Sequence, residues 1–493
     1  MTGTKIFWAV FCMIMISISS VSAKYIRQTE LTGVVNARNF YFVSDLLDGG
    51  VHQVMVKEDT MASVTLMNYI NEERYSEVDI DYVVEVRDTD KDEKSSLSSL
   101  QTLIVSTATR VGMGNLTGVV AAISAGGAGA VFWMWIIAII GSASALIEST
   151  LAQIYKRKGK DGECYGGPAY YIEAALHCRP LAIIFCISMI ATYAFGFNML
   201  ASYNLQSTFS GFSFYDVKWT PWIIGGILAV ITGWCLLGGG SRIVKVTSTL
   251  VPAMGVAYIL ISVIVMIINR AYLPVVFSKI ISEAFDFKAI FGAFAGSAMM
   301  QGIRRGLYSN EAGIGSAPNA SASAQVSHPI KQGLVQMLSV FIDTLLLCTA
   351  TAMMCLSSGI APAQELQGAP WVQAALHESL GNFGPLFITV AMVLFAFTTL
   401  LGNCFYCDNL LNYIHKGQPS KTFMKGFRIV SALVVFIGAG MEVSMLWNIS
   451  DVLMGVMALI NIPVILILSN TALKALEDYE KQKKNGENPV FKT

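Results

Sequence analysis

Charged residues are scarce in this 493-residue sequence. Lysine, arginine, aspartate and glutamate together make up 13% of it, about half of the roughly 25% that is usual in soluble globular proteins. Hydrophobic residues make up 54%, and the formal net charge is zero. The neutral balance gives no electrostatic sign of nucleic-acid binding. The composition therefore indicates an integral membrane protein.

Catalytic and metal-binding signals are also sparse. The nine cysteines are scattered, and only Cys404 and Cys407 form a C-x-x-C pair, inside an apolar run where packing is better supported than redox or metal chemistry. No G-x-x-x-x-G-K-[ST] phosphate loop occurs, so we expect the chain itself to hydrolyse no nucleotide. Five histidines are present, all between the apolar runs: His52, His177, His328, His377 and His415. These absences leave transport driven by an ion gradient as the natural function class.

Eleven apolar runs approach the 20 or so residues that a bilayer-spanning helix requires. Their order along the chain predicts an all-α integral membrane protein with eleven transmembrane helices. The runs cover residues 6–22, 98–125, 132–155, 181–205, 222–237, 246–268, 289–307, 334–355, 386–413, 426–440 and 447–468.

The first run resembles a secretory signal, because Val21-Ser22-Ala23 follows it like a cleavage site. The distribution of lysine and arginine favours a retained helix instead. With the N-terminus outside, 27 of the 33 lysines and arginines fall in inner loops, and without the long first linker the bias is still 19 to 5. We therefore predict an N-terminal transmembrane helix (1–23), a polar cytoplasmic linker (24–96), a membrane core (97–470) and a cytoplasmic tail (471–493), in a multi-pass protein of the cell membrane.

The second run is interrupted at mid-length by Gly112-Met113-Gly114-Asn115. Each glycine weakens a helix by roughly 1 kcal/mol relative to alanine, and in lipid the freed backbone groups need partners inside the protein. The second half-helix points its N–H groups at the interruption, where a carboxylate would bind. The first half ends in carbonyl groups near Ala108 and Val111 that suit a sodium ion. The alternative is a pair of glycines that serves only helix packing.

Several longer motifs resemble the alanine or glycine:cation symporter family, also called sodium:alanine symporters. They are VGMGNLTGVVAAISAGGAGAVFWMWIIAIIG, GGPAYYIE, RRGLYSNEAGIGSAPNASASAQVSHPIKQGLVQMLSVFIDTLLLCTATA and FAFTTLLGNCFYCDNLL. The likeness follows the family's order over roughly residues 97–470. It implies an amino-acid–polyamine–organocation-type core of two five-helix inverted repeats with one extra helix in front, and eleven runs equal one plus ten.

Matching interruptions in the two halves of a transporter mark its binding site. The sixth core helix contains FGAFAGSAMMQGIRRG, so we expect a break at Phe294-Ala295-Gly296-Ser297, with Gly302 as an alternative position. Small-residue packing is the other interpretation of this stretch.

These two breaks suit a zwitterionic amino acid. Its carboxylate is expected to accept hydrogen bonds from backbone N–H groups of the first break, and its ammonium to meet carbonyl groups of the second, with two side chains of the sixth core helix lining the pocket. Asn115 either contacts substrate or a second ion, or only caps the half-helix. The predicted substrate site comprises Gly112, Met113, Gly114, Asn115, Phe294, Gly296 and Met299.

The resemblance also implies a sodium site. The hydroxyls of Thr398 and Thr399 on the eighth core helix and the carbonyls of Ala108 and Val111 would form it, and such oxygens suit a hard cation. The alternative is that both hydroxyls bond back to their own helix. No cofactor is expected apart from Na⁺ as the coupling ion.

Charged residues inside spans are expensive and are functional candidates. Arg110 could pair with an acid at an inner gate or help to recognise substrate, whereas structural contacts are expected for Glu148 and Asp343. Three residues placed at the inner end of the sixth core helix are further gate candidates: Arg304, Arg305 and Glu311.

Two positions depart from the family's pattern. Met113 replaces the threonine of the usual G-T-G-N, and Ala201 stands near a position where members often carry glutamine. Both weaken the case for alanine as the specific substrate. The sequence predicts a secondary transporter, not an enzyme, which carries a small neutral amino acid such as alanine or glycine with Na⁺ across the lipid bilayer. The alternatives are a carrier of the same fold that is proton-coupled or takes another solute, and a non-transporting membrane sensor.

Overall fold

A computed structural model describes residues 110, 112–158, 164–237, 240–285, 297–362 and 368–491. They belong to one compact unit that covers residues 94–493. The predicted N-terminal helix and polar linker lie outside the described residues, as do Ala108, Val111, Phe294 and Gly296.

The described residues are helical except for one two-stranded antiparallel hairpin, β1 with β2. Three segments, labelled η, have the wider turns of a π-helix. The elements in chain order are η1 (Gly114–Gly118), α3 (Val119–Gly126), α4 (Ala130–Ile154), β1 (Arg157–Lys158), β2 (Cys164–Tyr165), α5 (Pro168–Leu176), α6 (Arg179–Ile190), η2 (Ala191–Phe197), α7 (Asn198–Ser207), α8 (Thr220–Leu237), α9 (Gly240–Ile268), α10 (Leu273–Ala284), α12 (Ala298–Asn310), α13 (Ala317–Ser321), α14 (Pro329–Val340), η4 (Phe341–Cys348), α15 (Thr349–Ser357), α16 (Ala369–Leu380), α17 (Phe383–Ile414), α18 (Lys421–Ala439) and α19 (Val443–Lys484).

Long apolar helices dominate this part of the chain. Seven helical stretches are long and apolar enough to cross a membrane, and an eighth is added if residues 253–268 and α10, which meet at 104°, are taken as one span. Many large apolar side chains on these helices are solvent-exposed, including Ile140 in α4, Val230 in α8 and Leu459 in α19. Such faces are stable only against lipid or another apolar surface, so the chain is a multi-pass membrane protein.

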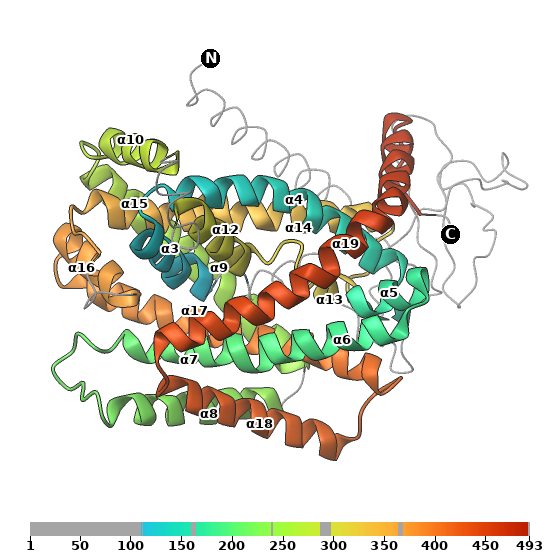
Figure 1. Cartoon of the computed structure of the whole chain (residues 1–493), viewed down its shortest axis with the longest axis horizontal. Coiled ribbons are helices and arrows are strands. Elements are labelled where there is room, and N and C mark those ends of the chain that lie inside the picture. Colours follow the sequence, from blue (N-terminus) through green and yellow to red (C-terminus); the bar gives the residue numbers. More distant parts are fainter. Residues whose placement is uncertain are drawn as a thin grey trace, which may run out of the picture. The chain divides into compact units, whose positions relative to one another are not determined.

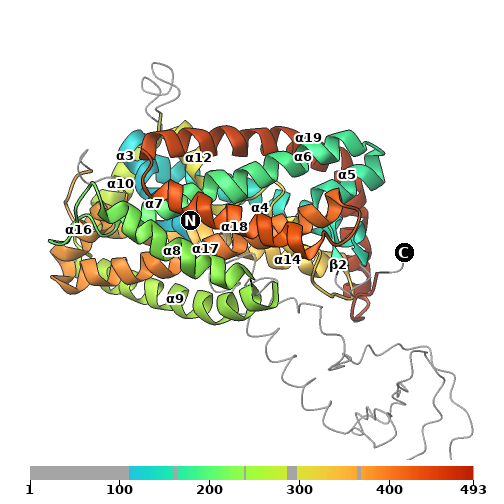
Figure 2. The same ribbon diagram turned by 90° about the horizontal axis from the view of Figure 1, so that it is seen from below.

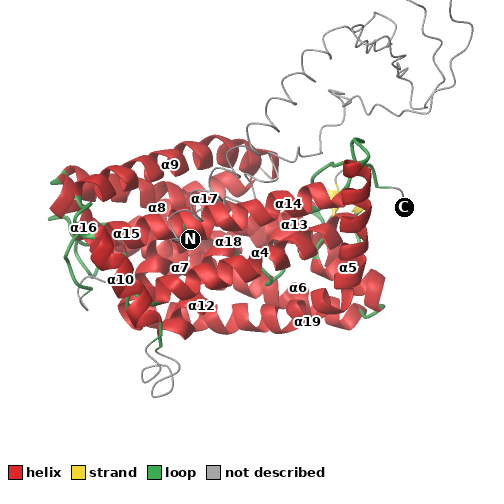
Figure 3. Cartoon of the chain, turned by 90° about the horizontal axis from the view of Figure 1, so that it is seen from above, coloured by secondary structure: helices red, strands yellow, loops and turns green. Residues whose placement is uncertain are grey.

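The long helices run roughly side by side along one direction (Figure 1). The short helices α10 and α16 lie at one end of the bundle, and α5, the β-hairpin and the C-terminus lie at the other (Figures 1 and 3). Helices α8 and α18 pack together on one side of the bundle (Figure 2). The position of each helix interruption can be described relative to these two ends of the bundle.

The apolar runs predicted most of these helices, with differences at their ends. Helix α9 begins at Gly240, before the predicted start at 246, and α19 continues to Lys484. Residues 471–484 of the predicted cytoplasmic tail therefore continue the last helix, with charged residues beyond its apolar part. The short helices α5, α10 and α16 were not predicted, since none is long enough to produce an apolar run of membrane length.

Candidate functional site

The first interruption is confined to one turn and a widened stretch of helix. Gly112 lies in a turn between helical Arg110 and Met113, and η1 follows directly. The Gly112 N–H donates to Asn115 Oδ1 at 2.9 Å. One side chain therefore satisfies a backbone donor that the turn releases, which is the capping role considered for Asn115. π-helical turns of this kind are frequent at functional sites.

The second interruption is longer and lies at a different position from the predicted one. Helix α12 ends at Asn310, and the next helix begins at Ala317. Three residues between them have positive φ: Glu311 (54°), Gly313 (80°) and Gly315 (86°). Left-handed backbone of this kind ends a helix and favours glycine. The break thus lies within the SNEAGIGSAP motif.

The alternative break position at Gly302 was wrong. Gly302 lies inside continuous α12, and a Cβ placed there would be 2.4 Å from the Ala130 carbonyl oxygen, so this glycine permits close helix packing. Ser297 begins the helix by accepting a hydrogen bond from the Met300 N–H at 3.2 Å. Met299, a predicted substrate-site residue, is in the first turn of α12, about 18 Å from the break at residues 311–316 at 1.5 Å per residue.

The second break lies beside the middle of α4. Helix α12 runs in the same direction as α4, with Gly302 against Ala130 near its start. A Cβ on Gly141, midway along α4, would lie 2.8 Å from the Ala312 Cβ, and α13 packs against the end of the same helix. The segment from α12 to α13 is therefore one crossing interrupted at half-length, as a transporter site requires.

The gate candidates do not lie at the predicted inner end of the sixth core helix. Arg304 and Arg305 lie in the half of the crossing that packs beside the start of α4. Both contact Asp451 Oδ2, from Nη1 at 3.9 Å and Nη2 at 2.6 Å respectively. The Arg305 guanidinium also lies 4.0 Å from the centre of the Trp447 ring. The predicted ion pairs are present, but they lie in the half of the bundle beside the start of α4 and not at the predicted inner end of the helix.

The two interruptions meet at a buried polar cluster. A Cβ on Gly114 would be 2.7 Å from the Ser309 Cα, so the chains touch there. Asn115 Nδ2 donates to Ser309 Oγ at 3.2 Å and to Asp343 Oδ1 at 2.7 Å. Asp343, which is fully buried, also accepts hydrogen bonds from Ser309 Oγ at 3.1 Å and Thr344 Oγ1 at 2.8 Å. Three donors therefore satisfy one buried carboxyl group.

Glu311 lies within the second break and not at a helix end near solvent. Its side chain is 2% exposed, and Oε2 accepts hydrogen bonds from Ser316 Oγ at 3.0 Å and the Tyr406 hydroxyl at 3.5 Å. The prediction of Glu311 as an inner-gate residue placed it too far along the crossing. A second carboxyl thus lies next to the meeting point of the breaks.

The two threonines predicted for the cation site behave differently. Thr398 Oγ1 donates to the carbonyls of Leu394 and Phe395 in its own helix, at 3.0 and 3.1 Å. Thr399 Oγ1 is buried without a hydrogen-bond partner among the described residues. It faces Gly112, since a Cβ there would lie 2.1 Å from it. The back-bonded alternative therefore holds for Thr398 only, and Thr399 presents a free oxygen to the first break.

Arg110 is fully buried and contacts α14. Its Nη1 donates to Gln336 Oε1 at 3.0 Å and to the Ser339 hydroxyl. Nε and Nη2 have no partner in the described part of the chain, and no carboxylate there lies within ion-pair distance. Arg110 is therefore held next to the first break by neutral groups, and not by the acidic gate partner that was considered.

Sequence reasoning missed Ser309, Tyr308 and Thr351. The Thr351 hydroxyl donates to the Asn115 carbonyl at 2.6 Å, and the Tyr308 ring lies 4.8 Å from Phe197 and 5.0 Å from Trp447 between ring centres. Tyr308 and Ser309 are part of the RGLYSNEAG motif, whose glycine after a run of helix-forming residues was an available signal for a helix end.

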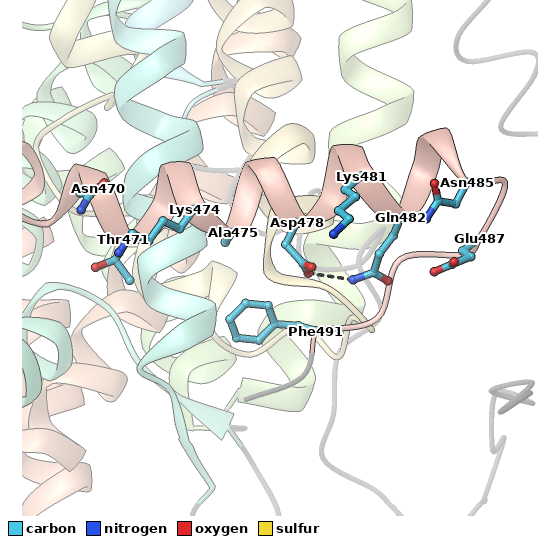
Figure 4. A pocket seen from close by; sticks show the side chains of 10 residues that line it. All are labelled: Asn470, Thr471, Lys474, Ala475, Asp478, Lys481, Gln482, Asn485, Glu487 and Phe491. Atoms are coloured by element: carbon cyan, nitrogen blue, oxygen red, sulfur yellow. Dashed lines mark hydrogen bonds between the residues drawn. The ribbon is translucent and has the colours of Figure 1, made fainter. Parts of the chain in front are cut away.

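Metal ligands are not clustered in the described residues: they contain no group of three histidine, cysteine, aspartate or glutamate side chains that could hold a metal ion. A cavity of about 720 Å³ lies along the end of α19, far in sequence from both breaks, and includes Lys474, Asp478 and Phe491 (Figure 4). Hydroxyl and carbonyl oxygens at the breaks, which suit an alkali cation, therefore remain the candidate cation ligands.

The chain is similar to several known proteins. The model of the sodium:alanine symporter family matches residues 77–493. The amino-acid carrier protein AlsT of Bacillus subtilis is 44% identical over 80% of this chain and 83% of its own length. The probable sodium/glutamine symporter GlnT of the same organism is 42% identical (81% and 82%), and the sodium/alanine symporter AgcS of Methanococcus maripaludis is 36% identical (80% and 87%).

A solved structure shares the fold. MhsT in complex with L-phenylalanine superimposes with a TM-score of 0.52 at 14% sequence identity, covering 77% of this chain and 92% of that one. At this identity the likeness concerns the fold alone, which is that of a helical membrane transporter.

Proposed function

Because the chain belongs to the sodium:alanine symporter family, we propose that it carries a small neutral amino acid with Na⁺ at the place where its two interrupted crossings meet. Membership makes the chain a sodium-coupled amino-acid symporter, not an enzyme, with Na⁺ as coupling ion. The observation that carries the proposed location is the contact of Asn115, next to the first break, with Ser309 and Asp343 at the second.

The substrate carboxylate binds at the first break. The N–H groups of Met113 and Gly114 lie at the start of η1, at the positive end of the helix that continues as α3. The Gly112 N–H is bonded to Asn115 Oδ1, so it contributes only if Asn115 turns away. Packing at this point is close, because a Cβ on Gly112 would lie 2.1 Å from Thr399 Oγ1 and one on Gly114 2.7 Å from Ser309 Cα, which favours a short substrate side chain such as that of alanine or glycine.

The substrate ammonium binds on the side of the second break. Carbonyl groups of residues 311–316 replace those near Phe294 and Gly296 as its acceptors, because the described interruption lies there. The Asp343 carboxylate next to Asn115 supplies a buried negative charge for the ammonium or for a second cation.

Sodium binds at the first break beside α17. The partnerless Thr399 hydroxyl is the supporting observation, and the Ala108 and Val111 carbonyls, outside the described residues, complete the proposed ligand set. Thr398 contributes only by giving up its bonds to its own helix.

The chain crosses the membrane eleven times in this proposal, as one helix followed by two inverted repeats of five. The N-terminus is outside and the C-terminus inside, so the end of the bundle with α10 and α16 is external. Moving Arg304 and Arg305 to the outer half leaves most lysines and arginines on the inner side. The pair of Arg305 with Asp451 is then an outer gate that opens and closes in alternating access.

Uptake into proteoliposomes tests the function. We expect labelled alanine or glycine to accumulate with an inward sodium gradient and not when choline replaces sodium. Accumulation that survives in choline and stops when the external pH is raised would instead indicate a proton-coupled carrier.

Counterflow with a panel of unlabelled L- and D-amino acids identifies the substrate. The panel includes glutamine, because one relative is named for it, and we expect alanine, glycine or serine to exchange fastest. Binding without accumulation for every member of the panel would contradict symport and favour a sensor.

A further inference from the structure

Glu148 is a buried carboxyl to which the proposed transport cycle gives no part. It lies in α4, is fully buried, and faces the second break. Its Oε1 accepts a hydrogen bond from the Gly313 N–H at 3.3 Å, and its Oε2 accepts one from Asn461 Nδ2 at 3.0 Å. The carboxyl thus connects α4, the break and α19.

Asn461 completes the arrangement from the other side. Its Nδ2 also donates to the Gly313 carbonyl at 2.9 Å, and its Oδ1 accepts from the Tyr171 hydroxyl at 2.5 Å. The left-handed turn at φ 80° separates the N–H and C=O groups of Gly313 from helical partners. Side chains from two different helices therefore hold these two groups. Asn461 is fully buried.

The pattern of donors requires an acceptor at position 148. Both partners of Glu148 present N–H groups to it, so a carboxylate accepts from both, whereas a glutamine amide of nearly equal size would place a donor against a donor. A buried carboxyl in a membrane protein is costly, and packing alone would be served by an apolar side chain. A role in fixing the position of the break would account for this cost in free energy.

We propose that Glu148 and Asn461 are positioning residues that fix the Gly313 peptide and thereby set the substrate-binding geometry of the second break. The inference rests on the proposed function for its transport readout. Neither side chain touches the meeting point of the two breaks, so each acts through the backbone of residues 311–316.

The experiment compares wild type with E148Q, N461D and the E148Q/N461D double variant, using S149A as a control at a buried neighbour on the same helix. In the double variant, the glutamine Nε2 can donate to the new aspartate while its Oε1 still accepts from Gly313. The aspartate keeps the bond from Tyr171. The double variant therefore restores the pairing between positions 148 and 461 that each single substitution disrupts, but it leaves the Gly313 carbonyl oxygen facing a carboxylate oxygen in place of Asn461 Nδ2.

We expect E148Q to raise the KM for the transported amino acid at least about tenfold while the maximal rate falls less. N461D, which loses the bond to the Gly313 carbonyl and sets two carboxyl groups against each other, is expected to raise the KM further than E148Q. The double variant is expected to have a clearly lower KM than N461D, and S149A the KM of wild type. A substitution that only unfolds part of the protein would lower the maximal rate and leave the KM alone. An unchanged KM in E148Q, or a double variant no better than N461D, would overturn the proposal.

Hydrogen–deuterium exchange of substrate-free protein gives a readout that does not depend on transport. Peptides covering residues 311–316 are expected to exchange faster in E148Q and N461D than in wild type, and more slowly in the double variant than in N461D. Equal hydrogen–deuterium exchange of these peptides in wild type and E148Q would contradict the inference even if the protein is an active transporter. If wild type fails to accumulate any amino acid but the exchange pattern appears, the proposed function fails and the positioning role stands.

Discussion

The two interrupted crossings solve the same backbone problem by different means. At the first, one turn at Gly112 and a π-helical stretch suffice, and Asn115 caps the freed donor three residues away. At the second, six residues leave the helix between Asn310 and Ala317. Asn310 and Asn319 hold some of their backbone groups from nearby in the sequence, but both polar groups of Gly313 are held by Glu148 and Asn461 from distant helices. The donor freed at the first break is capped locally, whereas the second break depends also on the tertiary structure.

This difference assigns separate tasks to the two breaks. A local break with a partnerless hydroxyl opposite it suits a compact cation. A break held from several helices can change when those helices move, and therefore suits a substrate site that must open and close. Substitutions at the two breaks are therefore expected to have different measurable effects on transport.

The largest effect is expected at Gly315. An alanine there would be strained at φ 86°, and its Cβ would lie 2.7 Å from Phe185 Cζ and 2.8 Å from Pro168 Cγ. G315A should therefore lose uptake almost completely and lower the yield of folded protein in size-exclusion chromatography. G455A, at a helical glycine with open space around it, is the control and should behave like wild type. Normal uptake by G315A would remove the case for a rigid second break.

Thr399 and Thr398 provide a matched pair at the first break. T399A removes the partnerless hydroxyl, and we expect the sodium concentration for half-maximal uptake to rise about tenfold or more, or roughly 1.4 kcal/mol. T398A removes a hydroxyl that is bonded to its own helix and should change this value less than threefold. The same shift in both variants, measured as uptake against sodium concentration, would show that the two hydroxyls are not distinct.

Arg305 and Arg304 distinguish a gate from the binding site itself. Arg305 is nearly buried and 2.6 Å from Asp451, whereas Arg304 is 38% exposed and 3.9 Å away. R305Q is expected to slow exchange several-fold with equilibrium substrate binding within about threefold of wild type, because the substitution affects opening rather than the site. R304Q should change exchange less than twofold, since exposed pairs contribute little. Loss of binding in R305Q would place this residue in the site.

The smallest effect is expected away from both breaks, at His328. Burial lowers the pKa of this side chain, and a hydrogen bond to Asp478 partly opposes the shift. The folded protein therefore favours the neutral ring, so its contribution to stability is complete above about pH 6.5 and is lost as the pH falls through the lowered pKa.

Thermal unfolding between pH 7.5 and 5 measures this contribution. Wild type should lose more stability on acidification than H328Q, which cannot be protonated there. Asp478 from α19 and Lys331 from α14 are the charged groups that face the ring. Parallel pH curves for the two proteins would contradict a role for His328.

Local features made much of the fold predictable. Membrane-length apolar runs predicted the long helices, and Gly112, Met113, Gly114 and Asn115 predicted the first break because its cap lies within the same turn. The break at residues 311–316 was not predicted because FGAFAGSAMMQG is richer in small residues than NEAGIGS, although Gly302 in fact lies against α4. Composition cannot distinguish a glycine that permits close packing from one that adopts positive φ.

The sequence by itself determined a multi-pass helical membrane protein, its family and the first break, since these depend on residue type and spacing along one helix. Only the tertiary structure decided where the second crossing opens and which of two adjacent threonines bonds back to its own helix. The physical reason is that a helix in lipid can unwind only where other side chains take up its freed groups. Those side chains, Glu148 in α4 and Asn461 in α19, lie 165 and 148 residues from Gly313.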